Sequence, residues 1–462
     1  MTEPLVLSGR GRMLAPPAEA GPARVTLDDA GFTVALANET RMAAYRDLDT
    51  IAVQDGAALV VLGSGAGAER VLLDLFGRAQ GQLVRELRER RLRQRAADAL
   101  MTLPPDEAIA MVEYEAGTQH GVGQLAYHAW GALLAPLDDR LPWVLLRRSR
   151  IAAVQPNDAG GSVEVELAVG PGDATGARGD GHVRFVGLGA AARLHTDRLE
   201  ALRTGALADA ARIIGALIPD APYAARQEAA GVLVDGHPAR PGDLPRSWSA
   251  IESGVMVDPT FASSYAQLRA RAGPLAEERA LAMAPTEPGG DEARSWFLVP
   301  LPGNLLALEL VSEGAHATYC FRVGSRAAFV AGADDPAAAA AAVRAVSEAL
   351  VDSRFLREPM ALTDEALAQP RYLRYRLALG ALPSLAAARA RFVARIVHRD
   401  DASWAAALDD LIAWHASTRD DGAVWPGRAA QDAMVDDASG DEPDAPHAGQ
   451  PDAPLPNTQG AP

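Results

Sequence analysis

The sequence contains no lysine, and all 44 of its basic residues are arginine. Because Ala, Arg, Gly and Pro are abundant, this absence is what a strong GC bias in the coding DNA produces, and it indicates no function. Cys320 is the single cysteine among 462 residues, which excludes an intrachain disulfide. It lies in a predicted strand over 316–323, where we expect a small, buried apolar side chain.

Long apolar runs are also missing. No run approaches the roughly 18 residues that a membrane-spanning helix needs, and the N-terminus lacks the charged-then-apolar pattern of a signal peptide. We therefore expect a cytoplasmic protein without stable membrane insertion. The net charge of −16 argues against nucleic acid as a partner, because the long-range field would repel phosphates.

Nine acidic residues and two arginines lie between Ser417 and the C-terminus. That segment is otherwise rich in Asp, Pro, Gly and Ala, and it has too little apolar surface to offset the entropy of ordering the chain. The sequence therefore predicts a disordered acidic tail over 417–462.

Two stretches of the chain share one plan. Ile51-Ala52-Val53-Gln54 and Ile151-Ala152-Ala153-Val154-Gln155 are each followed by a strand, a Gly-rich turn, a second strand and a helix. A partial third copy is predicted over 304–351, as a hairpin followed by a helix. A repeated ending of this kind predicts duplicated small domains.

The expected fold is α+β, with tandem small antiparallel barrel or sandwich units, each closed by a C-terminal helix. In the first unit this helix is expected from about 78 to 98, with Leu83, Val84 and Leu87 on its apolar face. The predicted divisions are an irregular, Pro- and Gly-rich N-terminus (1–19), a first unit (20–100), a second unit (113–217), a mixed region (218–351), a helical region (352–416) and the tail (417–462).

Within the mixed region, residues 246–283 are expected to be mainly helical. Within the helical region, helices are expected over 363–379, 384–397 and 402–416. A helix break is expected at Gly205, between predicted helices over 196–203 and 206–217.

The first unit resembles a pleckstrin-homology-like domain of the small bacterial kind, in tandem with the second. The residues that carry the resemblance are 25–32, 45–51, 71–76 and the helix to Asp98. Such domains bind phosphoinositides, peptides or proteins. The lipid-binding members resemble one another in a basic loop between the first two strands, whereas this chain has Asp28 and Asp29 there. The resemblance therefore implies an unidentified protein partner.

A second, local similarity covers about 35 residues, from His182-Val183-Arg184-Phe185 through Ala210-Ala211-Arg212. It is similar to the N-terminal domain of leucyl aminopeptidases. The catalytic domain of that family needs a lysine and a recognisable block of acidic residues. Because the chain has no lysine, we do not expect peptidase activity.

The run from Gly187 to Ala192 follows a predicted strand and has the G-x-G-x-x-A form of a dinucleotide fingerprint. The acidic residue at the right distance, Asp209, falls inside the predicted helix over 206–217. We interpret Gly187–Gly189 as an ordinary turn into a helix. The alternative is a nucleotide- or peptide-handling enzyme that uses this turn.

The densest basic patch lies on the predicted helix from 78 to 98. Its candidate partner-binding residues are Arg88, Arg90, Arg91 and Arg95. One interpretation is a solvated helix face with i,i+4 pairs such as Glu86 with Arg90. The other is a binding face for an acidic partner.

The nine histidines show no metal-binding spacing, and no Ser, Cys or Thr has a recognisable nucleophile setting. We therefore predict no catalytic residue, metal or cofactor. The function favoured by the sequence is a non-catalytic binding or scaffold protein, with a peripheral membrane-surface protein as a further alternative.

Overall fold

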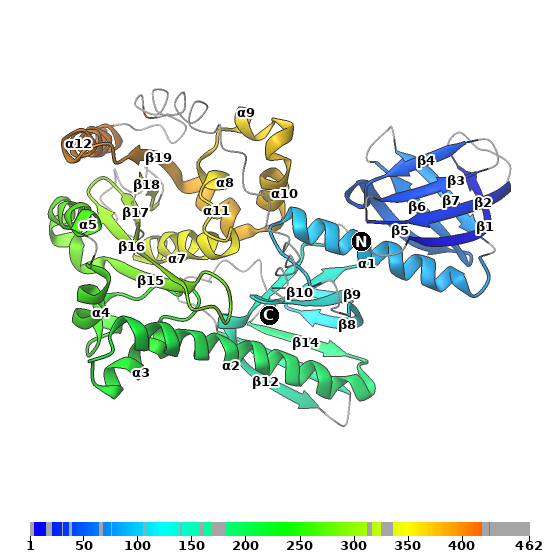
Figure 1. Ribbon diagram of the computed structural model, residues 1–462, viewed down its shortest axis with the longest axis horizontal. Coiled ribbons are helices and arrows are strands. Elements are labelled where there is room, and N and C mark those ends of the chain that lie inside the picture. The colour runs from blue at the N-terminus through cyan, green and yellow to red at the C-terminus, as the bar shows by residue number, and fades with distance from the viewer. Residues whose placement is uncertain are drawn as a thin grey trace, which may run out of the picture.

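The computed structural model describes residues 4–14, 21–29, 31–36, 39–63, 68–74, 76–104, 108–138, 141–157, 161–168, 181–257, 259–311, 317–324, 336–417 and 425. Over these residues the fold is α+β with three antiparallel sheets, which confirms the predicted class. Figure 1 shows the first sheet standing apart at one end, with the long helix α1 (Ala79–Asp98) running from it to the rest of the molecule.

The first sheet has seven strands in the order β4-β3-β2-β1-β7-β6-β5. They are β1 (Leu5–Met13), β2 (Gly21–Leu27), β3 (Phe32–Ala35), β4 (Thr40–Ala43), β5 (Leu48–Gln54), β6 (Ala57–Leu62) and β7 (Glu69–Asp74). The last strand returns beside the first, with Val71 opposite Met13. Helix α1 follows, and its Leu83, Val84 and Leu87 are buried in one core with the strands.

The second sheet repeats this order strand for strand, as β11-β10-β9-β8-β14-β13-β12. Its strands are β8 (Ala110–Ala116), β9 (Gln119–His128), β10 (Gly131–Pro136), β11 (Val144–Arg147), β12 (Ile151–Asn157), β13 (Ser162–Leu167) and β14 (His182–Val186). Helix α2 (Ala192–Leu217) comes after β14 as α1 comes after β7, and its Leu199 joins the core of this sheet.

Corresponding strands of the two sheets also share local irregularities. A 3-10 turn precedes each, η1 (Tyr45–Asp47) before β5 and η3 (Arg148–Arg150) before β12. A register shift then follows the first strand residue, Leu48 in one sheet and Ile151 in the other. The two Ile-Ala stretches thus lie in corresponding strands but three residues out of register, because Ile151 corresponds to Leu48 and not to Ile51.

Residues 5–13 form a central strand of the first sheet, so the predicted irregular N-terminus was wrong over this stretch. Glycine within a strand makes the strand harder to recognise from the sequence. In this strand the glycines have a packing role. A Cβ built on Gly9 would lie 2.5 Å from the ring of Phe76, and one on Gly11 would lie 2.9 Å from Leu73. The two glycines therefore leave the space that these side chains fill.

The third sheet is a five-stranded meander in chain order. Its strands are β15 (Ala280–Pro285), β16 (Ala293–Leu301), β17 (Leu305–Val311), β18 (Ala317–Arg322) and β19 (Phe392–Val397). The predicted strands and helix of 304–351 are present, but this order differs from the one that the first two sheets share. The predicted turn at 312–315 lies outside the described residues.

Helices cover both faces of the third sheet (Figure 1). One face carries α4 (Trp248–Val255), α5 (Pro259–Ala272) and α12 (Asp401–Ser417), and the other carries α7 (Pro336–Asp352), α10 (Leu373–Ala381) and α11 (Pro383–Arg391). The shorter elements are α3 (Tyr223–Val232), α8 (Glu358–Ala361) and α9 (Asp364–Leu367). Alternate residues of β16 enter the two cores, Phe297 with α5 and Trp296 with α7.

The helices that follow the two seven-stranded sheets both continue into the third. Leu92 and Ala96 of α1 join the core that contains α7, beyond the turns that pack on the first sheet. Ile213 and Ile214 of α2 join the core that contains α5. The two helices thus enter cores on opposite faces of the third sheet, and each fixes its own unit to it.

Two stretches predicted to be helical are strands, namely β15 at the end of 246–283 and β19 at the end of 384–397. Both are short apolar runs, for which helical and strand patterns are alike, so pairing with a neighbouring strand decides the outcome. The break expected at Gly205 is also absent, since α2 runs through it for 26 residues.

The predicted acidic tail lies outside the described residues except for Ser417 and Trp425. Trp425 is 3% exposed and packs in the same core as α5 and α12. Its indole Nε1 donates to the Asp410 carboxylate at 3.1 Å. This residue of the predicted tail is therefore buried against the folded part of the chain.

Candidate functional site

Arg148 occupies the first position of η3, which corresponds to Tyr45 of η1 in the first sheet. The Tyr45 hydroxyl donates to the carbonyl of Asp28 at 2.8 Å, inside its own unit. The side chain of Arg148, only 4% exposed, instead contacts residues beyond the second sheet. At this position the first unit therefore makes a contact within itself, whereas the second unit makes a contact with residues outside its sheet.

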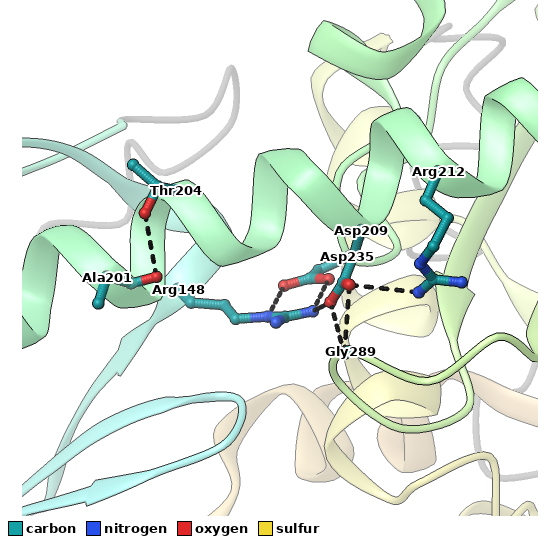
Figure 2. A network of polar contacts seen from close by, with 7 residues as sticks. All are labelled: Arg148, Ala201, Thr204, Asp209, Arg212, Asp235 and Gly289. Atoms are coloured by element: carbon teal, nitrogen blue, oxygen red, sulfur yellow. Dashed lines mark hydrogen bonds and ion pairs between the residues drawn. The ribbon is translucent and has the colours of Figure 1, made fainter.

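Two carboxylates share the Arg148 guanidinium (Figure 2). Nε and Nη2 donate to the two Asp235 oxygens at 2.6 and 2.8 Å, and Nη2 also donates to Asp209 at 2.7 Å. Asp209 lies on α2, and Asp235 lies in the segment after α3. Asp209 further accepts from the backbone N–H of Gly289, at 3.0 Å, and from Arg212, at 3.2 Å.

The pKa values of the two carboxyl groups move in opposite directions. Burial alone would raise the pKa of Asp209, but the Gly289 N–H and the Arg148 and Arg212 guanidinium groups outweigh it and lower that pKa. Burial raises the pKa of Asp235, against the influence of Arg148 and with the help of the Asp209 charge. Carboxylates that share one cation cannot both be fully stabilised as anions, and the one with fewer donors is the weaker acid.

This network connects the second sheet, α2, the segment after α3 and the β15–β16 loop around the buried side chains of Arg148, Asp209 and Asp235. A buried, hydrogen-bonded ion pair is costly to break because it leaves an uncompensated charge behind. Each charged group is held by an opposite charge, so the network serves to position the elements that carry these groups. We infer that it sets how the second sheet sits against the third.

The neighbouring residue Arg147 makes a second connection between the same parts. It donates to the carboxylate of Asp352 at the end of α7, which also accepts from the Ser384 hydroxyl. Burial lowers the pKa of Arg147, but the carboxylates of Asp352, Glu348 and Asp235 reverse this and raise it. Arg147 therefore remains a cation, paired on the side of α7.

A cavity lies where these two networks meet. Its empty space is about 540 Å³, including the part open to solvent. Leu100 and Met101 come from the segment after α1, His128 and Trp130 from the second sheet and its loop, and Arg354 from the turn after α7. Clefts where separate units meet are common places for small ligands.

His128 lines this cavity, and its pKa is strongly displaced from the ordinary value of a histidine. Burial lowers its pKa to about 4, and the charges of Arg354 and Arg147 contribute in the same direction. The imidazole is therefore neutral at pH 7, with one nitrogen able to donate and the other able to accept.

The arginines predicted as a partner-binding face contact the first unit itself. Each donates to a backbone carbonyl: Arg88 to Ile51, Arg90 to Asp28, Arg91 to Asp49 and Arg95 to Leu48. Three of these carbonyls belong to β5, an edge strand of the sheet. Open edges invite pairing with other chains, and these guanidinium groups occupy part of this one, between Leu48 and Ile51.

The predicted i,i+4 pair between Glu86 and Arg90 is confirmed, at 3.5 Å. Arg90 also lies over the Tyr45 ring, 6.0 Å from its centroid. Since the four arginines already have partners within the unit, their use as a face for another protein stays a prediction.

The turn at Gly187–Gly189 has structural reasons for its glycines. Gly187 and Gly189 have φ values of +71° and +52°, in the left-handed region that suits glycine. A Cβ on Gly161, in the loop before β13, would lie 2.9 Å from the Gly189 nitrogen, so two backbones meet closely here. Asp209, which has the spacing of a ribose-binding acid, is held by Arg148.

Within the part of the chain that the structure describes, no three or more His, Cys, Asp or Glu side chains are grouped to hold a metal ion. The described helices include none that is long and apolar enough to cross a membrane. Cys320 is completely buried in β18, as expected, and burial raises the pKa of its thiol.

Sequence reasoning did not find Arg148, Asp235 or Arg354. The available signal was weak: two consecutive arginines, Arg147 and Arg148, follow the apolar run of β11. A charged pair at the end of a strand is ordinary, and the partner Asp235 lies 87 positions away. The sequence had no way to show that these residues meet.

Comparison with known proteins leaves the family open. Neither a scan against protein families nor a search of curated sequences finds a match to this chain.

Proposed function

We propose that this protein is a non-catalytic binding or scaffold protein built on two pleckstrin-homology-like units, residues 5–98 and 110–217. The shared strand order supports this, because in both units the last strand returns beside the first and leads to a long helix. The 3-10 turn and register shift at the same place in both units add to that support. Fold alone does not choose a ligand.

One observation carries the assignment of roles: the two units differ in what covers them. In the second unit, all six residues of β10 are buried, and Leu133 and Ala135 pack in the core of the third sheet. In the first unit, the corresponding strand β3 buries Phe32 and Val34 while Thr33 is only half-buried. The second unit is thus used in assembly, and the first is presented to a partner.

The first unit exposes apolar side chains at both edges of its sheet. Met42 on β4 is 78% exposed and Val53 on β5 is 58% exposed. The loop between β2 and β3 carries Asp28 and Asp29. An acidic loop disfavours anionic lipid, so we propose that the partner is a protein that contacts these edges.

The test is affinity capture from the native host with the full chain, followed by mass spectrometry. Met42→Asp and Val53→Asp should each remove the same captured protein, at least tenfold by peptide intensity. Val257→Asp is the matched control, because Val257 is 79% exposed but lies after α4, outside the first unit. Capture that survives both substitutions, or a saturable turnover abolished by one substitution, would refute the proposal.

A further inference from the structure

The outer side of the first sheet carries a row of arginines. Arg10 and Arg12 alternate on β1 with residues that face the core, while Arg24 lies on β2 and Arg70 on β7. All four side chains are exposed. The strand pairing places Arg24 diagonally beside Arg10, and Arg70 diagonally beside Arg12. These four arginines form the basic face of the first unit.

The strand pairing also shows which residues of the second sheet match this row. Leu48 and Ile151 occupy the same position in the two units. From them the pairing runs through β6 and β7 to β1 in one unit, and through β13 and β14 to β8 in the other. It makes Ala116 of β8 the counterpart of Met13 of β1. The residues one and three positions before these two therefore correspond as well.

The corresponding positions are acidic. Glu113 and Glu115 of β8 stand where the first unit has its two β1 arginines, and both are exposed. Glu164 and Glu166 of β13 alternate with core valines and share the same outer side. Arg184 offsets part of this charge, since its guanidinium lies 3.6 Å from the Glu115 carboxylate and 3.5 Å from that of Glu164. The four glutamates form the acidic face of the second unit.

The two faces match in the amount and the spacing of their charge. Among the described positions on the outer side of β1, β2 and β7, Asp74 is the one acidic residue beside four arginines. On the outer side of β8, β13 and β14, Arg184 is the one arginine beside four glutamates. Alternate residues of a strand lie about 6.6–6.8 Å apart on one side. The β1 arginines and the β8 glutamates therefore have the same spacing.

Exposed apolar side chains lie on the same two faces. Val6, on the outer side of β1, is 41% exposed. On the second sheet Met111 is 47% exposed and Val122, opposite Glu113, is 43% exposed. Exposed ion pairs alone contribute little to binding. Burial of these apolar side chains in the same contact would add to it.

The two faces belong to separate parts of one molecule, because Figure 1 shows the first sheet well apart from the second. Each molecule thus offers both halves of a complementary contact to its neighbours. The net charge of −16 makes two copies repel each other at long range. At physiological ionic strength, however, charges are screened beyond about 8 Å. Faces in contact therefore interact more strongly than the rest of the two molecules.

We propose that the basic face of the first unit binds the acidic face of the second unit in another copy of this chain. The contact is heterologous, because two different surfaces meet. It uses neither Met42 nor Val53, so it is separate from the edges proposed to bind a different protein. Met42→Asp should accordingly leave self-association unchanged.

Sedimentation velocity of the full chain, at physiological salt and over a range of concentrations up to submillimolar, tests the proposal. We expect self-association that increases with concentration. Arg10→Glu combined with Arg12→Glu should weaken it at least tenfold, because two acidic surfaces then meet. Glu113→Arg combined with Glu115→Arg should weaken it as much, because two basic surfaces then meet.

A mixture of the two reversed variants separates a lost contact from a damaged fold. The first variant keeps the native acidic face and the second keeps the native basic face. Together they should associate at least tenfold more tightly than either does alone, which misfolded chains would not do. Arg246→Glu combined with Arg371→Glu is the matched control for the reversed arginines. It makes the same change in net charge at exposed positions outside the first two sheets, and it should self-associate as the wild type does.

Three results would overturn the proposal. One is a wild-type chain that stays monomeric at every concentration. Another is a reversed variant that associates as strongly as the wild type or its control. The third is a mixture of the reversed variants that remains monomeric.

Discussion

Replacing Arg148 by methionine should destabilise the protein more than any exposed arginine substitution. Among the described residues, the Asp235 carboxylate accepts side-chain hydrogen bonds from Arg148 alone. Breaking a buried ion pair from one side costs about 3–5 kcal/mol, because the other charge stays buried without a partner. Asp209 keeps the Gly289 N–H and Arg212, so we expect about 3 kcal/mol, at the lower end of that range.

The effect should depend on pH in a defined direction. Burial already raises the pKa of Asp235, and removing Arg148 would raise it further. A carboxyl group with a raised folded pKa favours the folded state below its unfolded pKa of about 3.9, and this advantage is lost as pH rises through the folded value. The destabilisation by Arg148→Met should therefore be largest near pH 7 and shrink towards pH 4.

Urea unfolding followed by circular dichroism at pH 7 and pH 4.5 measures both quantities. Hydrogen exchange at residues 144–150 and 205–212 then tests whether the loss is located at the junction. Arg203→Met is the matched control, since Arg203 pairs with Glu200 on the same helix, at 2.9 Å, with about a third of both side chains exposed. That pair should contribute less than about 1 kcal/mol. Equal effects of the two substitutions, or a loss that does not change with pH, would refute this reasoning.

Three further outcomes are expected. The pKa of His128 is about 4 in the folded protein and about 6.5 when unfolded. Its contribution to the free energy of unfolding is therefore complete above pH 6.5 and is lost as pH falls towards 4. The difference in unfolding free energy between wild type and His128→Gln should therefore change by about 3 kcal/mol over that range. His398→Ala should cost about 1–3 kcal/mol in urea unfolding, because the His398 ring lies 3.2 Å from the Glu309 carboxylate, which is 0% exposed, and 2.8 Å from the Thr318 hydroxyl, and its loss would leave buried polar groups without a partner; Glu309→Gln added to it should recover stability, and no recovery would contradict this account. Gly131→Ala should lower the melting temperature by several degrees, because its Cβ would lie 2.1 Å from the Leu146 carbonyl oxygen at a φ of +152°; an unchanged melting temperature would show that the backbone relaxes.

The junction gives the two similar units different roles. The first unit has a core of its own, within residues 13–87, and contacts the rest of the chain through the later turns of α1. The second unit is held through α2, β9 and β10 as well as through the two arginine networks. The first unit is therefore attached to the rest of the protein through one helix, α1, while the second unit packs directly against the third sheet and its helices.

Local periodicity allowed much of the first two units to be predicted. Val163 and Val165 alternate with polar residues and are buried, as a strand with one face in water requires. Leu83, Val84 and Leu87 recur at helical spacing and are buried against the first sheet. These patterns are visible because the burial of each residue is set by its own strand or helix.

The errors arose where tertiary neighbours outweigh local pattern. Gly9 and Gly11 suggested irregular chain, yet they leave room for Phe76 and Leu73 in the middle of a sheet. The residues of β19 were predicted as the end of a helix, but they pair with β18 instead, with Ile396 opposite Thr318. The types and spacing of these residues in the sequence do not reveal such neighbours.

The sequence by itself determined the α+β class, the positions of most strands and the long helices after β7 and β14. Periodicity reports which side of an element is buried, and that information is local. Only the tertiary structure decided what buries it: the register of the repeat, the pairing of Arg148 with Asp235 across 87 positions, and the cavity beside them. The physical reason is that a buried charge needs an opposite charge nearby in space, at any distance along the chain.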